Sequence, residues 1–159
     1  MNLKKIKTII SGGQTGADRA ALDFALENKI ESGGFIPKGR RAEDGKISEI
    51  YPNLVETKTK NYAERTELNV QNSDATLIVS HGKLTRGSLL TKRFAVKNRK
   101  PFLHIDFTEL TIDESVRETR KWLASQNCRR LNIAGARAST DAQIYDKTRE
   151  FLAALFGVR

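Results

Sequence analysis

The segment from Thr8 to Leu22 has the residue types and spacing best suited to chemistry. An apolar run ends at Ser11, and a glycine-rich turn and a helix-forming stretch follow it. Glycine allows positive φ and close approach of a ligand, and the first N–H groups of a helix lie at its positive dipole end. The pattern therefore predicts an anion site, with phosphate as the leading ligand. The predicted binding residues of this loop are Gly12, Gly13, Gln14, Thr15 and Gly16.

The glycine spacing matches neither the dinucleotide fingerprint nor the P-loop. A tight turn that binds nothing is the alternative, but Gln14 and Thr15 add side-chain donors that a turn does not require. Asp18 either complements the helix N-terminus or faces the site, where it would be a candidate catalytic group. No Ser/His/Asp arrangement and no spaced carboxylate pair stands out, so binding is favoured over catalysis.

A second glycine loop, residues 81–91, also leads into a predicted helix. Gly87 would supply a tight backbone and Ser88 an N-cap hydroxyl, although ordinary capping explains Ser88 equally well. We expect neighbouring parallel strands to place both glycine loops over one crevice. His81, at the end of a strand, is a second candidate catalytic group, whereas His104 inside a strand is more simply a core residue.

Two further segments carry polar groups that would reach such a crevice. Arg65 and Asn69 share one face of a predicted helix, where a guanidinium and an amide would bind a phosphate or a base. An exposed polar stripe is the alternative. Lys38 and Arg40 belong to a long irregular loop, residues 37–51, and long loops in compact domains are often lids or binding elements. These cations would cover the anion unless the adjacent acids neutralise them.

Strands and helices alternate along the chain and must position these loops. The predicted strands are near-continuous apolar runs, as in a parallel sheet covered on both faces. They are residues 7–11, 34–36, 76–80, 102–106 and 130–134. The predicted helices are residues 17–28, 61–72, 88–98, 113–127 and 140–156. The pattern predicts a single α/β domain, residues 1–159, with a doubly wound, mainly parallel sheet of about five or more strands, helices on both faces and the loops after the strands gathered at one edge.

Local patterns also predict how two helices begin and how one packs. Thr111 with Glu114, and Thr140 with Gln143, have capping-box spacing. The last helix carries an apolar stripe at helical spacing. Its members are Ile144, Thr148, Phe151, Leu152 and Leu155.

The charge of the chain is uneven. The net charge is +9, and residues 83–100 contain seven basic residues and no acidic one. Such a field favours an anionic partner, either a phosphorylated small molecule or nucleic acid. Aromatic residues make up only 7% of the chain and do not alternate with the basic ones as a stacking platform would require. Single-stranded nucleic-acid binding is therefore the third hypothesis.

Composition narrows the class of protein further. No apolar run approaches the ~18 residues of a membrane span, and no signal-peptide pattern precedes the first strand. We therefore expect a cytoplasmic protein with no membrane partner. The single cysteine, Cys128, has no partner for an internal disulfide and is expected to be a buried small residue. Because the two histidines are isolated and no His/Cys cluster occurs, no structural metal is expected.

Several segments, spread over nearly the whole chain, together form a pattern that is specific to one protein family. They are residues 11–20, 34–45, 64–66, 69–70, 73–78 and 87–88, with Thr91. Together they resemble the putative molybdenum carrier family. The resemblance implies a Rossmann-like fold and, as ligand, molybdenum cofactor, a pterin that bears a phosphate. Because relatives commonly self-associate, it also implies a homo-oligomer.

That family is similar to the phosphoribohydrolases that activate cytokinins and to the DNA-processing protein A group. Arg65 here matches the arginine of the phosphoribohydrolase helix, and Gly87 with Ser88 matches the Gly-Thr of their P-G-G-x-G-T-x-x-E motif. Thr91 stands where their glutamate assists cleavage of a nucleoside monophosphate, and Thr66 replaces a lysine. The resemblance thus implies a phosphate cradle that includes Thr91, without the carboxylate for that hydrolysis.

We therefore expect a ligand carrier or binding protein that holds an anionic small molecule, either molybdenum cofactor or a nucleotide. The alternative is a nucleotide-processing enzyme or sensor, similar to an N-glycosidase, with Asp18 or His81 in place of the missing glutamate.

Overall fold

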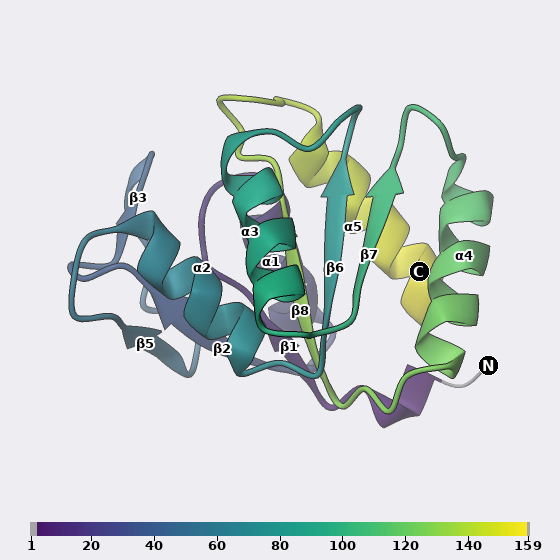
Figure 1. Cartoon of the computed structure of the whole chain (residues 1–159), viewed down its shortest axis with the longest axis horizontal. Coiled ribbons are helices and arrows are strands. Elements are labelled where there is room, and N and C mark those ends of the chain that lie inside the picture. The colour runs from purple at the N-terminus through teal and green to yellow at the C-terminus, as the bar shows by residue number, and fades with distance from the viewer. Residues whose placement is uncertain (1–2, 159) are drawn as a thin grey trace.

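A six-stranded, entirely parallel sheet forms the centre of the molecule (Figure 1). The structure is a computed structural model that describes residues 3–158. Across the sheet the strand order is β5-β2-β1-β8-β6-β7. The strands are β1 (Thr8–Ile10), β2 (Glu31–Ile36), β5 (Leu54–Glu56), β6 (Ala75–Ser80), β7 (Phe102–Asp106) and β8 (Arg130–Gly135). The predicted parallel α/β sheet is confirmed.

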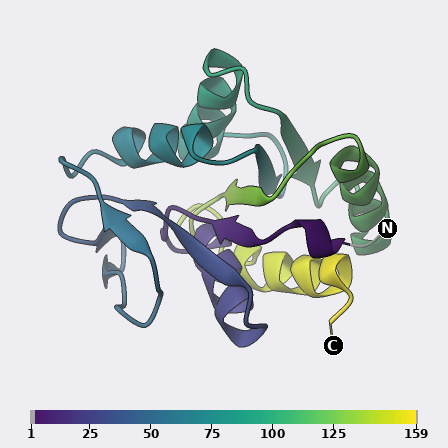
Figure 2. The same ribbon diagram turned by 90° about the horizontal axis from the view of Figure 1, so that it is seen from below.

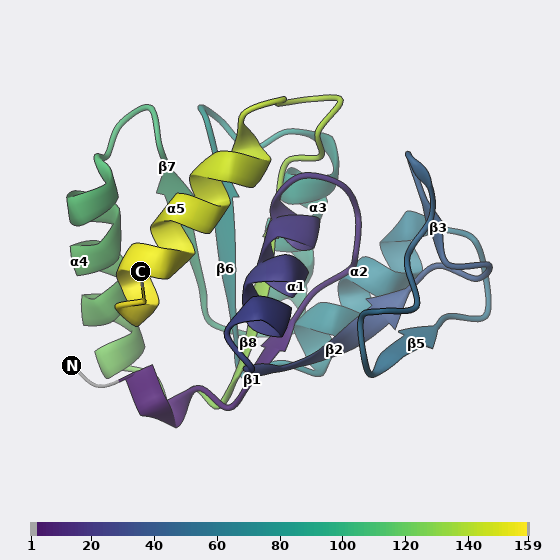
Figure 3. The same cartoon turned by 180° about the vertical axis from the view of Figure 1, so that it is seen from behind.

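Helices cover both faces of this sheet. The chain contains a short 3-10 helix, η1 (Leu3–Lys5), and the helices α1 (Ala17–Glu27), α2 (Tyr62–Gln71), α3 (Arg86–Lys97), α4 (Ile112–Ala124) and α5 (Ile144–Phe156). Figure 2 shows α2 and α3 on one face of the sheet, with α1 and α5 on the other. Figure 3 shows α4 beside α5, near the edge strand β7. No helix within the described residues is long and apolar enough to span a membrane.

Burial on both faces explains the apolar character of the central strands. All six residues of β6 and all three of β1 are buried. The predicted stripe of α5 is also confirmed, because each of its five members is fully buried. Cys128 is 3% exposed, and burial, aided by the nearby Asp74 carboxylate, raises the pKa of its thiol to about 12. It is therefore an unreactive core residue, as predicted.

The position of β8 corrects one expectation. We expected the two glycine loops to follow neighbouring strands, but β8 lies between β1 and β6 and pairs with both. The last strand of the chain is thus inserted at the centre of the sheet. Its own loop, residues 136–143, consequently lies between the two glycine loops and contributes to the same edge.

Several predicted boundaries and caps are also wrong. Helix α5 begins at Ile144, and Gln143 is an N-cap without a side-chain hydrogen bond, so the predicted capping box at Thr140 does not form. The box of Thr111 and Glu114 is present. Helix α3 begins earlier than predicted, so its N-cap is Thr85 rather than Ser88.

The predicted irregular loop, residues 37–51, contains ordered structure. It holds an antiparallel hairpin of β3 (Arg41–Ala42) and β4 (Gly45–Lys46). A small second core, formed by Leu22, Ile36, Ala42, Ile47 and Tyr51, anchors this hairpin to α1 and β2. The edge strand β5 follows the hairpin and was not predicted, because one half-buried and two exposed residues form no recognisable buried apolar run.

Candidate functional site

A pocket opens at the edge of the sheet where the parallel strands end, and it brings the two glycine loops together. Its cavity volume is about 80 Å³. The walls come from the loop after β1, from α2, from the first turn of α3 and from the end of β8. The lining residues are Gly12, Gln14, Asp18, Tyr62, Arg65, Thr66, Asn69, Thr85, Arg86, Gly87, Ser88, Leu90, Thr91, Asn132, Ala134, Gly135, Ala136, Arg137 and Thr140.

A buried ion pair forms the floor of the pocket. The Nη1 atom of Arg65 donates to the carbonyl of Gly12 at 2.6 Å and to Oδ2 of Asp18 at 3.1 Å. A Cβ atom on Gly12 would lie 1.9 Å from the same Nη1 atom, so glycine is needed there to admit the guanidinium. Burial raises the pKa of Asp18 above its ordinary value, although the guanidinium of Arg65 and the amide of Gln14 favour the ionised form.

Gln14 brings an unpartnered donor to the pocket. Its Oε1 atom accepts from the amides of Thr15 at 3.0 Å and Glu43 at 2.9 Å, which fixes the orientation of the side-chain amide. The Nε2 atom is buried and has no hydrogen-bond partner within residues 3–158. Gln14 is only 5% exposed, and an unsatisfied buried donor is costly. An acceptor supplied by a ligand would remove that cost.

Most backbone amides of the first glycine loop, in contrast, are bonded within the protein. The amide of Gly13 donates to Ser11 Oγ and that of Gln14 to Asp18 Oδ2. The first amide of α1, on Ala17, donates to the carbonyl of Ala136. The loop therefore offers an anion its side chains rather than the row of free N–H groups that the glycine pattern suggested.

The first turn of α3 forms the opposite wall. Ser88 Oγ donates to the carbonyl of Thr85, and Thr91 Oγ1 donates to the carbonyl of Gly87, so both hydroxyl protons are used inside the helix. Within the described chain, the amides of Arg86 and Gly87 have no partner. These amides lie at the positive end of a 12-residue helix. The wall therefore presents backbone donors rather than hydroxyl donors.

Three guanidinium groups lie close to the ring of Tyr62, which lines the pocket. The Cζ atoms of Arg41, Arg65 and Arg137 lie 5.1, 5.5 and 5.5 Å from the centroid of its ring. Such cation–π contacts hold arginine side chains in place without neutralising them. Arg65 has an acidic partner in Asp18, and Arg137 lies 3.8 Å from Glu43. Three guanidinium groups around Tyr62 thus face two carboxylates, which leaves an excess of one positive charge.

Some predicted site residues lie in this pocket and others do not. Gly12, Gln14, Asp18, Arg65, Asn69, Gly87, Ser88 and Thr91 line it, whereas Gly13, Thr15, Gly16, Lys38, Arg40 and His81 do not. Asn69 bonds the backbone of Phe35 through both its amide atoms, at 2.7 and 2.9 Å, and so joins α2 to β2.

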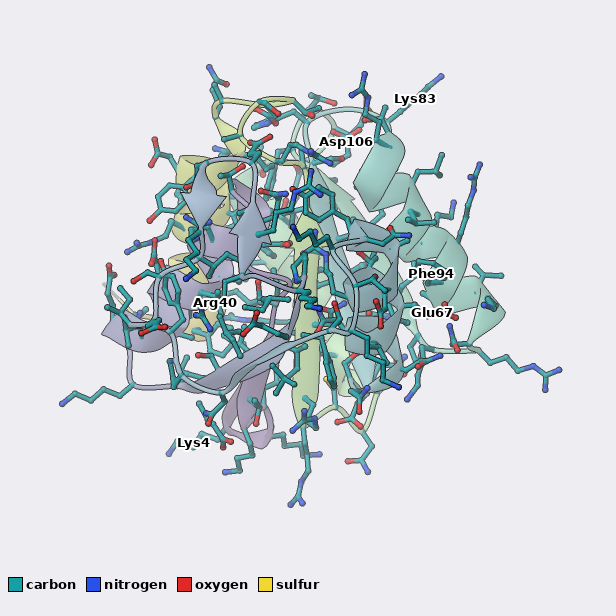
Figure 4. The ribbon with its side chains drawn as sticks, turned by 90° about the vertical axis from the view of Figure 1, so that its left-hand side faces the viewer. Lys4, Arg40, Glu67, Lys83, Phe94 and Asp106 are labelled. Carbon is teal, nitrogen blue, oxygen red and sulfur yellow. The ribbon has the colours of Figure 1, made fainter. Side chains whose placement is uncertain are left out.

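The predicted residues outside the pocket have identifiable structural partners. A Cβ atom on Gly16 would lie 2.3 Å from the carbonyl oxygen of Ala136, so packing requires that glycine. The guanidinium of Arg40, labelled in Figure 4, donates to the carbonyls of Ile47 and Ser48 inside its own loop. His81 Nδ1 lies 2.6 Å from Asp141 Oδ2, which joins the loops after β6 and β8.

His104 is half-buried rather than fully buried, and its Nε2 atom lies 2.6 Å from Ser80 Oγ. Figure 4 places Lys83 at the same end of the molecule as Asp106, which ends β7, and Lys4 at the opposite end. The basic segment that begins at Lys83 thus starts at the edge that carries the pocket.

Sequence reasoning did not select Tyr62, Arg137 or Glu43. Each becomes recognisable only when α2, the loop after β8 and the hairpin meet at one edge. Arg137 lies in a loop that was expected at this edge, and its position directly after a strand is the one local indication of its role. Within the described residues, no group of three or more His, Cys, Asp or Glu side chains is arranged to hold a metal ion.

The comparisons with known proteins agree with this fold. The family model of the circularly permuted YpsA SLOG family matches residues 9–156. A crystal structure described as a "Putative molybdenum carrier protein" from Syntrophus aciditrophicus SB is 50% identical to the chain, with a TM-score of 0.93. The match covers 96% of this chain and 95% of that one. Among curated proteins, none matches significantly.

Proposed function

The chain belongs to the circularly permuted YpsA SLOG family, and from that premise we propose that it binds a phosphate-bearing small molecule with the phosphate between Gln14, Arg65 and Gly87. The observation that carries this proposal is the buried Nε2 donor of Gln14, which has no partner within residues 3–158. A phosphate oxygen would accept from that donor, and the unpaired amides at the start of α3 would bind the remaining oxygens.

Gly87 supports the same placement. A Cβ atom built on it would meet no atom within 4 Å, and its φ is not positive, so neither packing nor backbone geometry requires glycine there. A ligand that lies against the backbone would explain why this position has no side chain.

The cavity sets a limit on the ligand. A volume of about 80 Å³ holds one phosphate group, whereas pockets that enclose drug-sized molecules have ~300–1,000 Å³. We infer that the phosphate is buried and that the heterocycle lies outside, near Tyr62 and Arg137. Molybdenum cofactor, suggested by the name of the Syntrophus relative, fits this arrangement through its phosphate. Cys128 is the one cysteine of the chain, and it does not line the pocket, so no thiol there could bind the metal of such a molecule. The protein would therefore hold the molecule through its phosphate and pterin.

Calorimetric titration with inorganic phosphate and with a nucleoside monophosphate tests the proposal. Gln14→Glu keeps the Oε1 acceptor but replaces the unpartnered donor by a carboxylate oxygen, so the affinity for either ligand should fall by about 100-fold, or ~2.7 kcal/mol. Gln71→Glu makes the same change on the exposed side of α2 and should alter the affinity less than about twofold. Equal affinities for all three proteins would refute the proposed site.

Asp18 favours a second candidate function, the hydrolysis of an N-glycosidic bond. Asp18 lines the pocket, and burial raises its pKa in the direction that a general acid requires, against the opposing effect of the Arg65 guanidinium. Incubation with nucleoside monophosphates should then release free base, and Asp18→Asn should abolish the release. If the wild-type protein releases no base while it binds these nucleotides, the function is binding alone.

A further inference from the structure

The carboxylate at the tip of the β3–β4 hairpin is bound as a ligand would be. Glu43 Oε1 accepts from the amide of Ser139 at 3.1 Å and from the hydroxyl of Thr15. Its Oε2 atom accepts from Ser139 Oγ at 2.5 Å and lies 3.8 Å from Arg137 Nη1. Two loops that follow separate strands, β1 and β8, therefore converge on one carboxylate.

The donors around Glu43 are oriented by the rest of the protein. Thr15 Oγ1 accepts from the amide of Ala138 at 3.1 Å, which leaves its proton for Glu43. Partial burial raises the pKa of Glu43, but the hydrogen bonds from Ser139 and Thr15 outweigh this effect and lower it below the ordinary value of 4.5. The donor set thus stabilises a negatively charged oxygen pair.

This donor set adjoins the phosphate pocket. The backbone amide of Glu43 donates to Oε1 of Gln14, a residue that lines the pocket. Arg137 both faces Glu43 and lines the pocket. The hairpin has an independent anchor, because Asp44 accepts from both terminal nitrogens of Arg19 at 3.0 and 3.2 Å. Glu43 can therefore leave its donors without release of the whole hairpin.

We propose that Thr15, Ser139 and Arg137 form a second oxyanion subsite, which Glu43 occupies as an internal ligand until a small molecule with two phosphoryl groups displaces it. This inference rests on the proposed function, which places the first phosphoryl group in the adjoining pocket. Glu43, at the tip of the hairpin, then leaves its donors only when a ligand is long enough to reach both subsites.

Titration of the full chain with inorganic phosphate and with inorganic pyrophosphate tests the inference. Glu43→Gln keeps the shape of the side chain and one acceptor oxygen, but it removes the negative charge and replaces the other oxygen by an NH₂ group, so the internal ligand is weakened. The affinity for pyrophosphate should rise about tenfold or more, while the affinity for phosphate, which occupies the pocket alone, should change less than about twofold. Ser139→Ala should lower the affinity for pyrophosphate.

Asp44→Asn is the matched control, because it loosens the same hairpin but leaves the Glu43 carboxylate in place. The inference is overturned if Asp44→Asn raises the pyrophosphate affinity as much as Glu43→Gln does, or if Glu43→Gln raises the affinity for both anions equally. The first result would show hairpin mobility alone, and the second a general effect of charge. If neither anion binds any of the proteins, the proposed function fails together with this inference.

Hydrogen exchange of the wild-type protein provides a readout that needs no variant. Pyrophosphate should accelerate exchange of the Glu43 backbone amide, because this amide leaves the Gln14 acceptor when the subsite is taken. Phosphate should leave this exchange unchanged. Unaltered exchange with saturating pyrophosphate would also overturn the inference.

Discussion

Replacement of Arg65 by methionine should strongly destabilise the protein. Arg65 is 8% exposed, and its guanidinium donates to the carbonyl of Gly12, to Asp18 and to the carbonyl of Tyr62. Removal of one partner from a buried ion pair costs about 3–5 kcal/mol. Without the guanidinium, the carboxyl group of Asp18 must either stay charged without a partner or take up a proton. Urea unfolding should therefore show a loss of about 3–5 kcal/mol at pH 8.

The pH dependence tests the origin of that loss. The pKa of Asp18 is raised in the folded wild-type protein, so folding favours its protonated form, and the contribution of this group to stability falls as the pH rises above 3.8. Loss of Arg65 raises this pKa further. The difference between Arg65→Met and wild type should therefore be smallest at low pH, where Asp18 is protonated in both proteins, and should grow as the pH rises.

Two controls accompany this experiment. The double variant Arg65→Met with Asp18→Asn removes both charges and should recover about 1–3 kcal/mol relative to the single variant. Lys97→Met removes an exposed pair with Glu67 and should cost less than about 1 kcal/mol. A cost below about 1 kcal/mol for Arg65→Met, or the same cost at every pH, would refute the assignment of a buried charge pair.

Three further predictions concern backbone geometry, caps and ligand access. Gly16→Ala should destabilise the protein far more than Gly39→Ala, because both glycines have φ +80° but only a Cβ on Gly16 would meet a backbone carbonyl, at 2.3 Å. Chemical denaturation of the two variants measures this difference. Equal losses of unfolding free energy would contradict the packing argument. Thr111→Ala removes a helix cap and should lower the free energy of unfolding by about 1 kcal/mol, whereas Thr140→Ala should lower it by less than about 0.5 kcal/mol. The reverse order of unfolding midpoints would contradict the observed helix starts. Gly87→Ala should leave thermal stability unchanged or raise it, while the affinity for phosphate, measured by calorimetry, should fall about tenfold. An unchanged affinity would show that the ligand does not lie against this backbone.

Much of the fold could be predicted because its determinants are local. Buried parallel strands such as β6 produce continuous apolar runs, and the stripe of α5 follows the helical period. The order of the strands depends instead on pairing between distant segments, so the central position of β8 left no local trace. The hairpin of β3 and β4 has strands of two residues, too short for any periodic pattern.

The site could be predicted only in part for a related reason. The glycines and Arg65 were recognisable from type and spacing, and they do converge on one pocket. Which donors are free depends on tertiary contacts. The backbone amides of Gly13 and Gln14 are bonded to neighbouring side chains. The side-chain Nε2 donor of Gln14, in contrast, has no partner within residues 3–158. Spacing alone cannot distinguish a satisfied donor from an unsatisfied one.

The most direct test of the phosphate site is a crystal structure of the protein soaked with tungstate, a heavy tetrahedral analogue of phosphate. The anomalous signal of tungsten locates the anion without prior assumptions about its position. We predict the strongest peak within hydrogen-bond distance of Gln14 Nε2 and the amide of Gly87. Strong anomalous peaks confined to the exposed basic residues after Lys83, with none in the pocket, would contradict the account.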